Sequence, residues 1–336
     1  MPELAFTIFE IEKENSRLGL IAKSGLLKTR IGTALFQLFN KRKFNKGIHI
    51  FEMESGADIL LIKLPFPISF LSALNRQYIE RYISHIYSKR GCKNCFVPAA
   101  ARRLGWFEQY STNANSRNIV FKALLLPVLD EIYSKSGLRL DNLDTAFVNG
   151  ENAVELITMV KQLEPFMRYI NVASSNKGVV ERELTDISTD SGISIFVSSD
   201  FKSILRNAEL VINLGKVSDI SRYRIRTGTL VINFSGAESP LPQGEYTIIV
   251  GLEYTFPESH CDLLGEDIQR SFCRSELTEI MMAFNAGLLN GGSYNETTAA
   301  LILSIFARKC CSITGFNGRR GVLRVENVLK AIRMKH

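Results

Sequence analysis

The sequence predicts an α/β protein: a doubly wound, mostly parallel sheet domain, a second α/β domain before it, and a C-terminal helical block. Three observations predict this class. Between residues 141 and 255, six apolar runs rich in Val, Ile and Leu alternate with helical or short polar links, as buried parallel strands do. Residues 57–99 read as strand, helix and strand, which predicts another parallel crossover. A chain of 336 residues is also near the limit of a single core.

The predicted domains are a basic N-terminal α/β domain at 1–140, the doubly wound domain at 141–255, and a helical segment at 256–336 that packs back on the first domain. Residues up to 140 hold 21 Lys and Arg against 11 Asp and Glu, whereas the remainder holds 20 against 23. A basic first half can attract nucleic acid, an acidic membrane surface, a phosphorylated substrate or an acidic carrier protein. A solvated basic surface without a partner is the alternative.

The opening segment is predicted to be mostly helical up to about Asn45. In LLKTRIGTALFQLF the apolar residues recur at helical spacing, namely at Leu27, Ile31, Ala34, Leu35, Leu38 and Phe39. The basic run Lys41-Arg42-Lys43 follows them. A basic amphipathic helix can lie on a membrane, but such a face more often packs on its own domain, and we expect packing here.

The crossover begins with the apolar runs IHIFEM and ADILLIKLPFP, followed by a helix over Ser72–Ser88 and the strand NCFVPA. The polar stretch from Tyr110 to Asn118 is predicted to be a loop. The next helix, FKALLLPVLDEIYSKSG, is predicted to kink at Pro127, because proline cannot donate the backbone hydrogen bond that a helix interior requires.

The six apolar runs of the doubly wound domain are TAFVN, YINVAS, ISIFVSS, ELVINLG, TLVINFS and YTIIVG. After them the composition becomes helical, with one helix over Cys273–Leu289. A second helix, TAALILSIFA, follows a capping-box spacing at Ser293–Glu296, and the tail ENVLKAIRMK predicts a third.

The turn after the first of these strands, DTAFVNGENAVELI, lies where a Rossmann domain binds a pyrophosphate. Such a turn needs small residues at three positions. Gly150 fits the second position and Ala153 the third, but the first falls on the β-branched Val148, and Glu151 places a negative charge nearby. The sequence therefore allows a Rossmann-like dinucleotide site or a plain strand-to-helix turn without a ligand.

The end of the second strand bears on the choice of cofactor. NAD sites usually carry an acidic residue there, which binds the ribose hydroxyls. Here Ser174, Ser175 and Lys177 suit a 2′-phosphate better, so NADP is favoured over NAD. Gly215 and Gly251 end two later strands, where a nicotinamide ring would pass, although both also fit as ordinary strand-end glycines.

A family resemblance follows from three segments, FKSILRNAELVINLGK, IRTGTLVINFSG and TIIVGLEY. They resemble the NAD(P)-binding domain shared by shikimate dehydrogenases, glutamyl-tRNA reductases and methylenetetrahydrofolate dehydrogenases. The wider layout is similar to that of the long-chain acyl-carrier-protein reductases. The resemblance covers about residues 60–290 and implies a Rossmann fold with a nicotinamide cofactor.

The sequence lacks the catalytic residues of these families at the matching positions. The late helix that bears a nucleophilic cysteine in the acyl-carrier-protein reductases reads IMMAFNAGLL here, with Met281, Met282 and Ala283 and no cysteine. The Lys/Asp pair of shikimate dehydrogenases has no match in LPFP or STNAN. We therefore expect an NAD(P)-dependent oxidoreductase acting in the interdomain cleft on an anionic or carrier-linked carbonyl substrate. The alternative is a catalytically inactive Rossmann-fold binding or regulatory protein.

Other chemistry is weakly signalled. Cys92 and Cys95 form a lone CxxC without further zinc-ligand spacing, so packing cysteines and no metal site are predicted. His260 lacks a visible partner for acid–base work, and the glycine-flanked arginine pair within Gly315–Gly321 is predicted to be a solvated turn. Irregular cysteine spacing without an export signal predicts a cytoplasmic protein.

Overall fold

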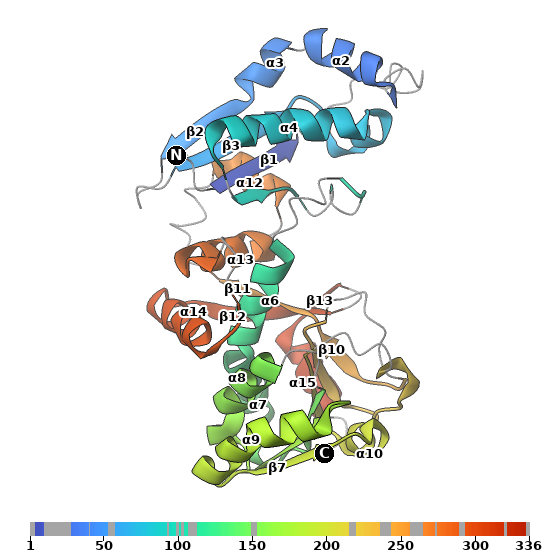
Figure 1. Cartoon of the computed structure of the whole chain (residues 1–336), viewed down its shortest axis with the longest axis vertical. Helices are drawn as coiled ribbons and strands as arrows, with labels where there is room; N and C mark the ends of the chain where they lie inside the picture. The colour runs from blue at the N-terminus through green and yellow to red at the C-terminus, as the bar shows by residue number, and fades with distance from the viewer. Residues whose placement is uncertain are drawn as a thin grey trace. The chain divides into compact units, whose positions relative to one another are not determined.

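The computed structural model describes residues 4–9, 28–39, 41–52, 58–92, 94–98, 101, 104–106, 113–148, 153–214, 220–235, 243–255, 265–272, 274–288, 293–318 and 321–333. The chain forms two compact units (Figure 1). The first unit combines Met1–Ser116 with Glu258–Gly291, and the second unit combines Arg117–Pro257 with Gly292–His336. The division therefore differs from the predicted boundaries at residues 140 and 255, since each unit uses two separate segments of the chain.

The first unit contains a four-stranded sheet in the order β2 (Ile48–Glu52), β3 (Asp58–Leu64), β1 (Leu4–Phe9), β4 (Asn94–Phe96). Strands β3, β1 and β4 are parallel, and β2 is antiparallel to β3. Helix α4 (Arg76–Arg90) connects β3 to β4, which confirms the predicted parallel crossover. The predicted helical start is wrong over β1: its segment LAFTIF lies between two strands, where its apolar residues are buried on both faces of the sheet.

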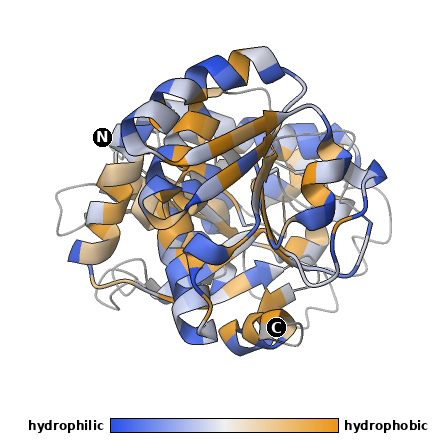
Figure 2. Cartoon of the chain, turned by 90° about the horizontal axis from the view of Figure 1, so that it is seen from below, coloured by the Kyte–Doolittle hydropathy of each residue, from blue (hydrophilic) through white to orange (hydrophobic). Residues whose placement is uncertain are grey.

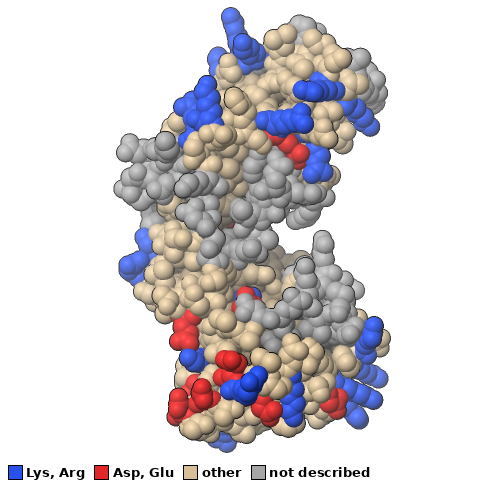
Figure 3. Space-filling view, viewed as in Figure 1, with Lys and Arg blue, Asp and Glu red and all other residues tan. Residues whose placement is uncertain are grey.

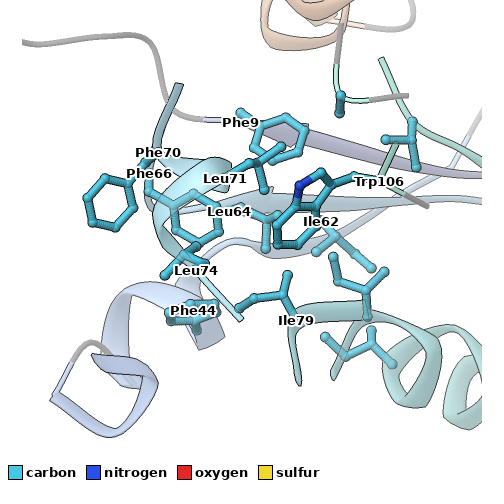
Figure 4. Packing of buried hydrophobic residues seen from close by; sticks show 14 of the residues in the cluster. Phe9, Phe44, Ile62, Leu64, Phe66, Phe70, Leu71, Leu74, Ile79 and Trp106 are labelled. Atoms are coloured by element: carbon cyan, nitrogen blue, oxygen red, sulfur yellow. The ribbon is translucent and has the colours of Figure 1, made fainter. Parts of the chain in front are cut away.

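The described residues of this unit also form shorter helical elements, namely α2 (Arg30–Phe39), α3 (Lys41–Lys46), η2 (Ile68–Ala73), α12 (Gly265–Ser271) and α13 (Arg274–Asn285). Helix α4 begins where the Asn75 side chain accepts a hydrogen bond from the Tyr78 backbone N–H, and it ends at Gly91 with φ of 68°. Aromatic rings fill the core beneath the sheet, among them Phe44, Phe66 and Phe70 (Figure 4).

The second unit is built on the predicted six-stranded sheet. Its strands are β5 (Thr145–Val148), β6 (Tyr169–Ala173), β7 (Ser194–Ser198), β8 (Leu210–Asn213), β9 (Leu230–Asn233) and β10 (Thr247–Ile249). All are parallel, in the order β10-β9-β8-β5-β6-β7. This is the Rossmann order, in which the chain runs outward from the centre and then returns to continue on the other side. The predicted fold class is confirmed, and the reversal lies between β5 and β8.

Helices link these strands. Helix α8 (Ala153–Leu163) follows β5, α9 (Lys177–Ser191) follows β6, and α10 (Phe201–Asn207) follows β7. Such helical connections are what consecutive parallel strands require, because a tight turn cannot join them. Figure 2 shows hydrophobic residues concentrated along strands and on the helix faces beside them.

Two consecutive helices precede the sheet. The first, α6 (Asn113–Ala123), begins within the stretch predicted to be a loop, so that prediction is wrong from Asn113 onward. The second, α7 (Leu125–Ser136), is separated from α6 at Leu124. The break confirms the kink expected from Pro127, whose missing N–H and bulky ring disrupt bonding to the carbonyl of residue 123.

The C-terminal segment is divided between the units. Helices α12 and α13 belong to the first unit, whereas α14 (Glu296–Arg308) and α15 (Val325–Arg333) belong to the second, where α15 packs on α7. Asn295, rather than the predicted Ser293, caps α14 by accepting the Thr298 N–H at 2.9 Å. The segment is also not wholly helical, because an antiparallel sheet is formed by β11 (Gly251–Thr255), β12 (Ser312–Gly318) and β13 (Gly321–Leu323).

No helix in the described part of the chain is both long enough and apolar enough to cross a bilayer.

Candidate functional site

The carboxyl ends of five parallel strands lie in one register row. Val148 ends β5 and pairs with Ala173 of β6 on one side and with Asn213 of β8 on the other. The row continues to Ser198 of β7 and to Asn233 of β9. In doubly wound sheets, ligands bind outside the carboxyl ends at the point of reversal. That point lies here between Val148 and Asn213.

A buried amide network occupies this row beside the reversal. The Asn213 Nδ2 donates to Asn233 Oδ1 at 2.7 Å and to Ser235 Oγ at 3.2 Å. The Ser235 hydroxyl also donates to Asn233 Oδ1, at 2.7 Å. Both asparagine side chains belong to residues that are only 1% exposed. Three polar side chains are thus held together at the ends of two central strands.

One atom of this network has no partner among the described residues: the buried Oδ1 of Asn213 accepts no hydrogen bond from them. A buried polar atom without a partner costs free energy, so such atoms in a folded protein call for an explanation. An acceptor at the switch point suits a ligand that donates an N–H or O–H. The sequence reasoning missed this residue, although the repeated tetrapeptide LVIN at 210–213 and 230–233 places an asparagine at the end of both strands.

The predicted phosphate-binding residues lie at the same edge, one strand beyond β5. Ser174 follows β6 directly, is buried, and its Oγ accepts the backbone N–H of Asn176 at 3.2 Å. Ser175 is exposed, and the exposed Lys177 begins the 15-residue helix α9. No acidic residue occurs in the first turn of α9, and Asn176 makes no side-chain cap bond there. The positive end of a helix dipole and a nearby cation favour an anion.

The remaining predicted cofactor residues are dispersed. Ala153 is the half-buried first residue of α8, next to the edge. Gly150 and Gly215 lie outside the described residues. Gly251 begins β11 and pairs with Asn317, whose side chain would contact an added Cβ at 3.4 Å. Val148 is fully buried as the last residue of β5, so the described chain holds it in extended conformation before any turn.

An ion pair between a buried lysine and a half-buried glutamate lies beside the start of α8. Lys122 of α6 donates to Glu155 at 2.5 Å, and its Nζ lies 5.9 Å from the centroid of the Tyr294 ring. The Tyr294 hydroxyl donates to Gln162 at 2.8 Å, and burial raises the pKa of this tyrosine well above its ordinary value. The pair neutralises an acidic side chain in the first turn of α8, close to where a pyrophosphate would approach.

Helix α6 also packs beside the amide network. The Phe121 ring contacts Phe234, the residue that follows Asn233, with 4.5 Å between centroids. Both rings are buried. The side chains after β9 are therefore held between the sheet edge and α6.

Three hollows in the described surface lie elsewhere. One of about 500 Å³ is lined by residues 138–141 and 165–168, which precede β5 and β6, and one of about 20 Å³ includes 226–229, before β9. The third, of about 670 Å³, lies between α10 and residues 222–227 and is lined by five cations: Lys202, Arg206, Arg222, Arg224 and Arg226. These hollows are lined mainly by residues that precede strands. The site at the carboxyl edge is therefore argued from strand order and hydrogen bonding.

The other sequence candidates offer no chemistry among the described residues. Cys95 packs in the core of the first unit, and burial, aided by the neighbouring Cys92, raises its pKa to about 12. Such a thiol stays protonated and unreactive at neutral pH. His260 and Arg319-Arg320 lie outside the described residues. Among the residues that the structure describes, there is no group of three or more His, Cys, Asp or Glu able to hold a metal ion.

Comparison with known proteins yields loose structural similarities. No family model and no curated protein matches the chain. Among solved structures, shikimate dehydrogenase from Aquifex aeolicus is 11% identical, with 90% of this chain and 97% of that chain covered and a TM-score of 0.29. A ligand-free 5-ketofructose reductase from a Gluconobacter species is 9% identical, with 91% and 99% covered and a TM-score of 0.28.

L-Tryptophan dehydrogenase from Nostoc punctiforme is 10% identical, with 99% of this chain and 87% of that chain covered and a TM-score of 0.26. TM-scores below 0.5 at such identities do not allow any property of these enzymes to be transferred. The fold assignment rests on the strand order of the second unit.

Proposed function

We propose that the second unit binds a nicotinamide dinucleotide at the carboxyl edge of its six-stranded sheet. The observation that carries the proposal is the buried Oδ1 of Asn213, which has no hydrogen-bond partner in the described part of the chain and lies at the switch point of a sheet with Rossmann strand order. The network with Asn233 and Ser235 fixes the orientation of this amide. In that orientation Asn213 supports binding of a hydrogen-bond donor, such as a carboxamide or a ribose hydroxyl.

The cofactor form is proposed to be NADP. The turn after β6 presents Ser174, Ser175 and Lys177 and no carboxylate, and it leads directly into the start of α9. A 2′-phosphate would gain charge-assisted hydrogen bonds there, whereas the ribose hydroxyls of NAD would lack their usual acidic acceptor. When bound, such a cofactor would supply a hydride. The chain is then an NADP-dependent oxidoreductase acting on an anionic or carrier-linked carbonyl substrate.

A second candidate function is a Rossmann-fold binding or regulatory protein without a redox reaction. A specific observation favours it: among the described residues that immediately follow β5 to β10, there is no Cys, His or Tyr to exchange a proton with a substrate. Both candidates share the dinucleotide site and differ only in what happens after binding.

The experiment is a titration of the purified chain with NADPH and NADH, followed by the fluorescence of the reduced cofactor. We expect NADPH to bind more tightly than NADH. Asn213→Leu should weaken both by about 5- to 100-fold, the loss of one buried hydrogen bond. Lys177→Gln should weaken NADPH about tenfold and leave NADH unchanged, since only the 2′-phosphate carries the extra charge.

Lys330→Gln, which removes an exposed cation of the second unit on α15, is the matched control and should bind like the unchanged protein. If neither reduced cofactor binds, the proposal fails in both forms. If NADPH binds but no carbonyl compound tested accelerates its oxidation, the result supports the binding or regulatory function without a redox reaction. Equal affinity for NADPH and NADH, unaffected by Lys177→Gln, would remove the preference for NADP.

A further inference from the structure

Helix α2 carries two apolar faces, and one of them is open to solvent. Successive helical residues are 100° apart, so Ile31, Leu35 and Leu38 form one stripe. These side chains belong to residues that are 75%, 43% and 63% exposed, respectively. The opposite face holds Thr33 and Phe36, which are buried. The expectation that the predicted apolar face packs on its own domain is therefore wrong for these three residues.

The buried face fixes α2 to the first unit. The Phe36 ring lies 5.7 Å from that of Phe70 and 6.2 Å from that of Phe66, measured between centroids. The Thr33 hydroxyl accepts the backbone N–H of Asn75 at 2.9 Å. Figure 4 shows Phe66 and Phe70 within the core that receives Phe36. Because these contacts set the rotation of α2, the stripe of Ile31, Leu35 and Leu38 cannot turn inward without breaking them.

The chain around this stripe is strongly basic. Residues 28–46 contain six Lys and Arg and no Asp or Glu. Helix α3 buries Phe44 and exposes its cations, Lys41, Arg42, Lys43 and Lys46. Lys28 and Arg30 are exposed at the start of α2. In Figure 3 Lys and Arg predominate over Asp and Glu on the visible surface of the helical end of the first unit.

We propose that α2 and α3 bind the surface of a membrane that contains anionic lipid, with Ile31, Leu35 and Leu38 entering the boundary between headgroups and acyl chains. An exposed aliphatic stripe flanked by cations is the composition of helices that lie in this interface. Few apolar residues are available, so binding needs both the stripe and the attraction of the cations to anionic headgroups.

Two other occupants fit less well. A second copy of the chain would use the same surface on both partners, so a symmetric contact would place the basic residues of one copy against those of the other. Nucleic acid would match the charge, but it would leave three aliphatic side chains without an apolar partner, since its backbone is read by cations and polar groups. Of these three occupants, an anionic lipid surface is the one that complements both the charge and the apolar stripe.

The test is flotation of the full chain with vesicles of phosphatidylcholine alone and of phosphatidylcholine with about one third phosphatidylserine. We expect flotation only with the anionic vesicles and its loss at high salt, because surface charges are then screened. The triple variant Lys41→Gln/Arg42→Gln/Lys43→Gln should bind about a hundredfold more weakly, at roughly one cation's contribution per residue.

The triple variant Ile31→Ser/Leu35→Ser/Leu38→Ser should lose binding to a similar degree. Leu301→Ser is the matched control, since Leu301 lies on α14 and is 43% exposed, like Leu35. It should float as the unchanged chain does. Because the changed side chains are all exposed, circular dichroism of every variant should match that of the unchanged chain.

Three results would overturn the proposal. The first is that the unchanged chain does not float with anionic vesicles. The second is that the serine variant floats as well as the unchanged chain, and retention on duplex DNA would then assign the basic surface to nucleic acid. The third is that the serine variant abolishes self-association in gel filtration while vesicle binding persists, which would assign the stripe to a second copy. The test is independent of the proposed dinucleotide site, because the residues changed on α2 and α3 all belong to the first unit.

Discussion

The Oδ1 of Asn213, which accepts no hydrogen bond from any residue that the structure describes, should make two neighbouring asparagines differ in their contribution to stability, and unfolding experiments can measure the difference. Asn213→Leu removes two hydrogen bonds donated by Nδ2, each contributing about 1 kcal/mol net. It also removes a buried acceptor whose unmet hydrogen bond costs about 1–3 kcal/mol. Asn233 Oδ1 keeps the hydroxyl of Ser235 as a donor. The two effects offset each other, so the free energy of unfolding should change by no more than about 1 kcal/mol.

Asn233→Leu should behave differently, because Asn233 Oδ1 accepts three hydrogen bonds. It accepts from Asn213 Nδ2 at 2.7 Å, from the Ser235 hydroxyl at 2.7 Å and from the Ser235 backbone N–H at 3.4 Å. Without it, buried donors lose their acceptor and nothing is relieved. The expected loss is about 2–4 kcal/mol.

Urea titrations followed by circular dichroism measure both changes, and the fluorescence of Trp106, the single tryptophan, reports the first unit separately. The transition seen by Trp106 should not shift in either variant if the units unfold independently. An Asn213→Leu variant destabilised as much as Asn233→Leu would refute the reasoning. It would mean that Oδ1 is already hydrogen-bonded within the protein, and the argument for a ligand at this atom would disappear.

Three further predictions concern other contacts. Lys122→Met should lower the free energy of unfolding of the second unit by about 3 kcal/mol in urea titrations, because it leaves Glu155 unpaired. The double variant Lys122→Met/Glu155→Leu should be more stable than Lys122→Met, and a less stable double variant would contradict this explanation. The buried Cys95 thiol should contribute fully to stability below about pH 9, and this contribution should be lost as the pH rises toward its raised pKa of about 12. Cys95→Ala should therefore make the free energy of unfolding less dependent on pH in the alkaline range. In peptide mapping, iodoacetamide should modify the exposed Cys310 long before Cys95. Asp200→Ala should lower the free energy of unfolding by about 1 kcal/mol, because the Asp200 carboxylate accepts hydrogen bonds from two backbone N–H groups at the start of α10. An unchanged urea midpoint would show that these hydrogen bonds contribute nothing to stability.

The sheet of the second unit could be predicted from the sequence because its central strands β5, β8 and β9 are buried along their whole length and read as continuous apolar runs. Residues 210–213 and 230–233, for example, are fully or almost fully buried and have the same sequence, LVIN. Strand β1 could not be predicted in the same way, since LAFTIF is short and its apolar run is equally compatible with a buried helix. What makes it a strand is its position between β3 and β4, a pairing over large sequence separations.

The candidate site was only partly accessible to sequence reasoning. The end of β6 was found from its place after the second strand, and Ser174, Ser175 and Lys177 lie at the carboxyl edge as expected. Asn213 could not be identified from the sequence, because its role depends on Asn233, which lies 20 residues further along the chain. Only the pairing of β8 with β9 brings the two side chains together. An isolated asparagine at a strand end looks like an ordinary turn residue.

Helix α2 shows why periodicity predicts a helix more reliably than it predicts which face is buried. Its apolar residues occupy two stripes on opposite sides, one through Phe36 and one through Ile31, Leu35 and Leu38. Spacing alone gives equal support to burying either stripe. The contacts of Phe36 and Thr33 with the first unit decide the rotation, and they leave the more aliphatic stripe outside. A large apolar surface left in water weakens solubility unless a partner covers it, and the surrounding cations exclude partners that share their charge.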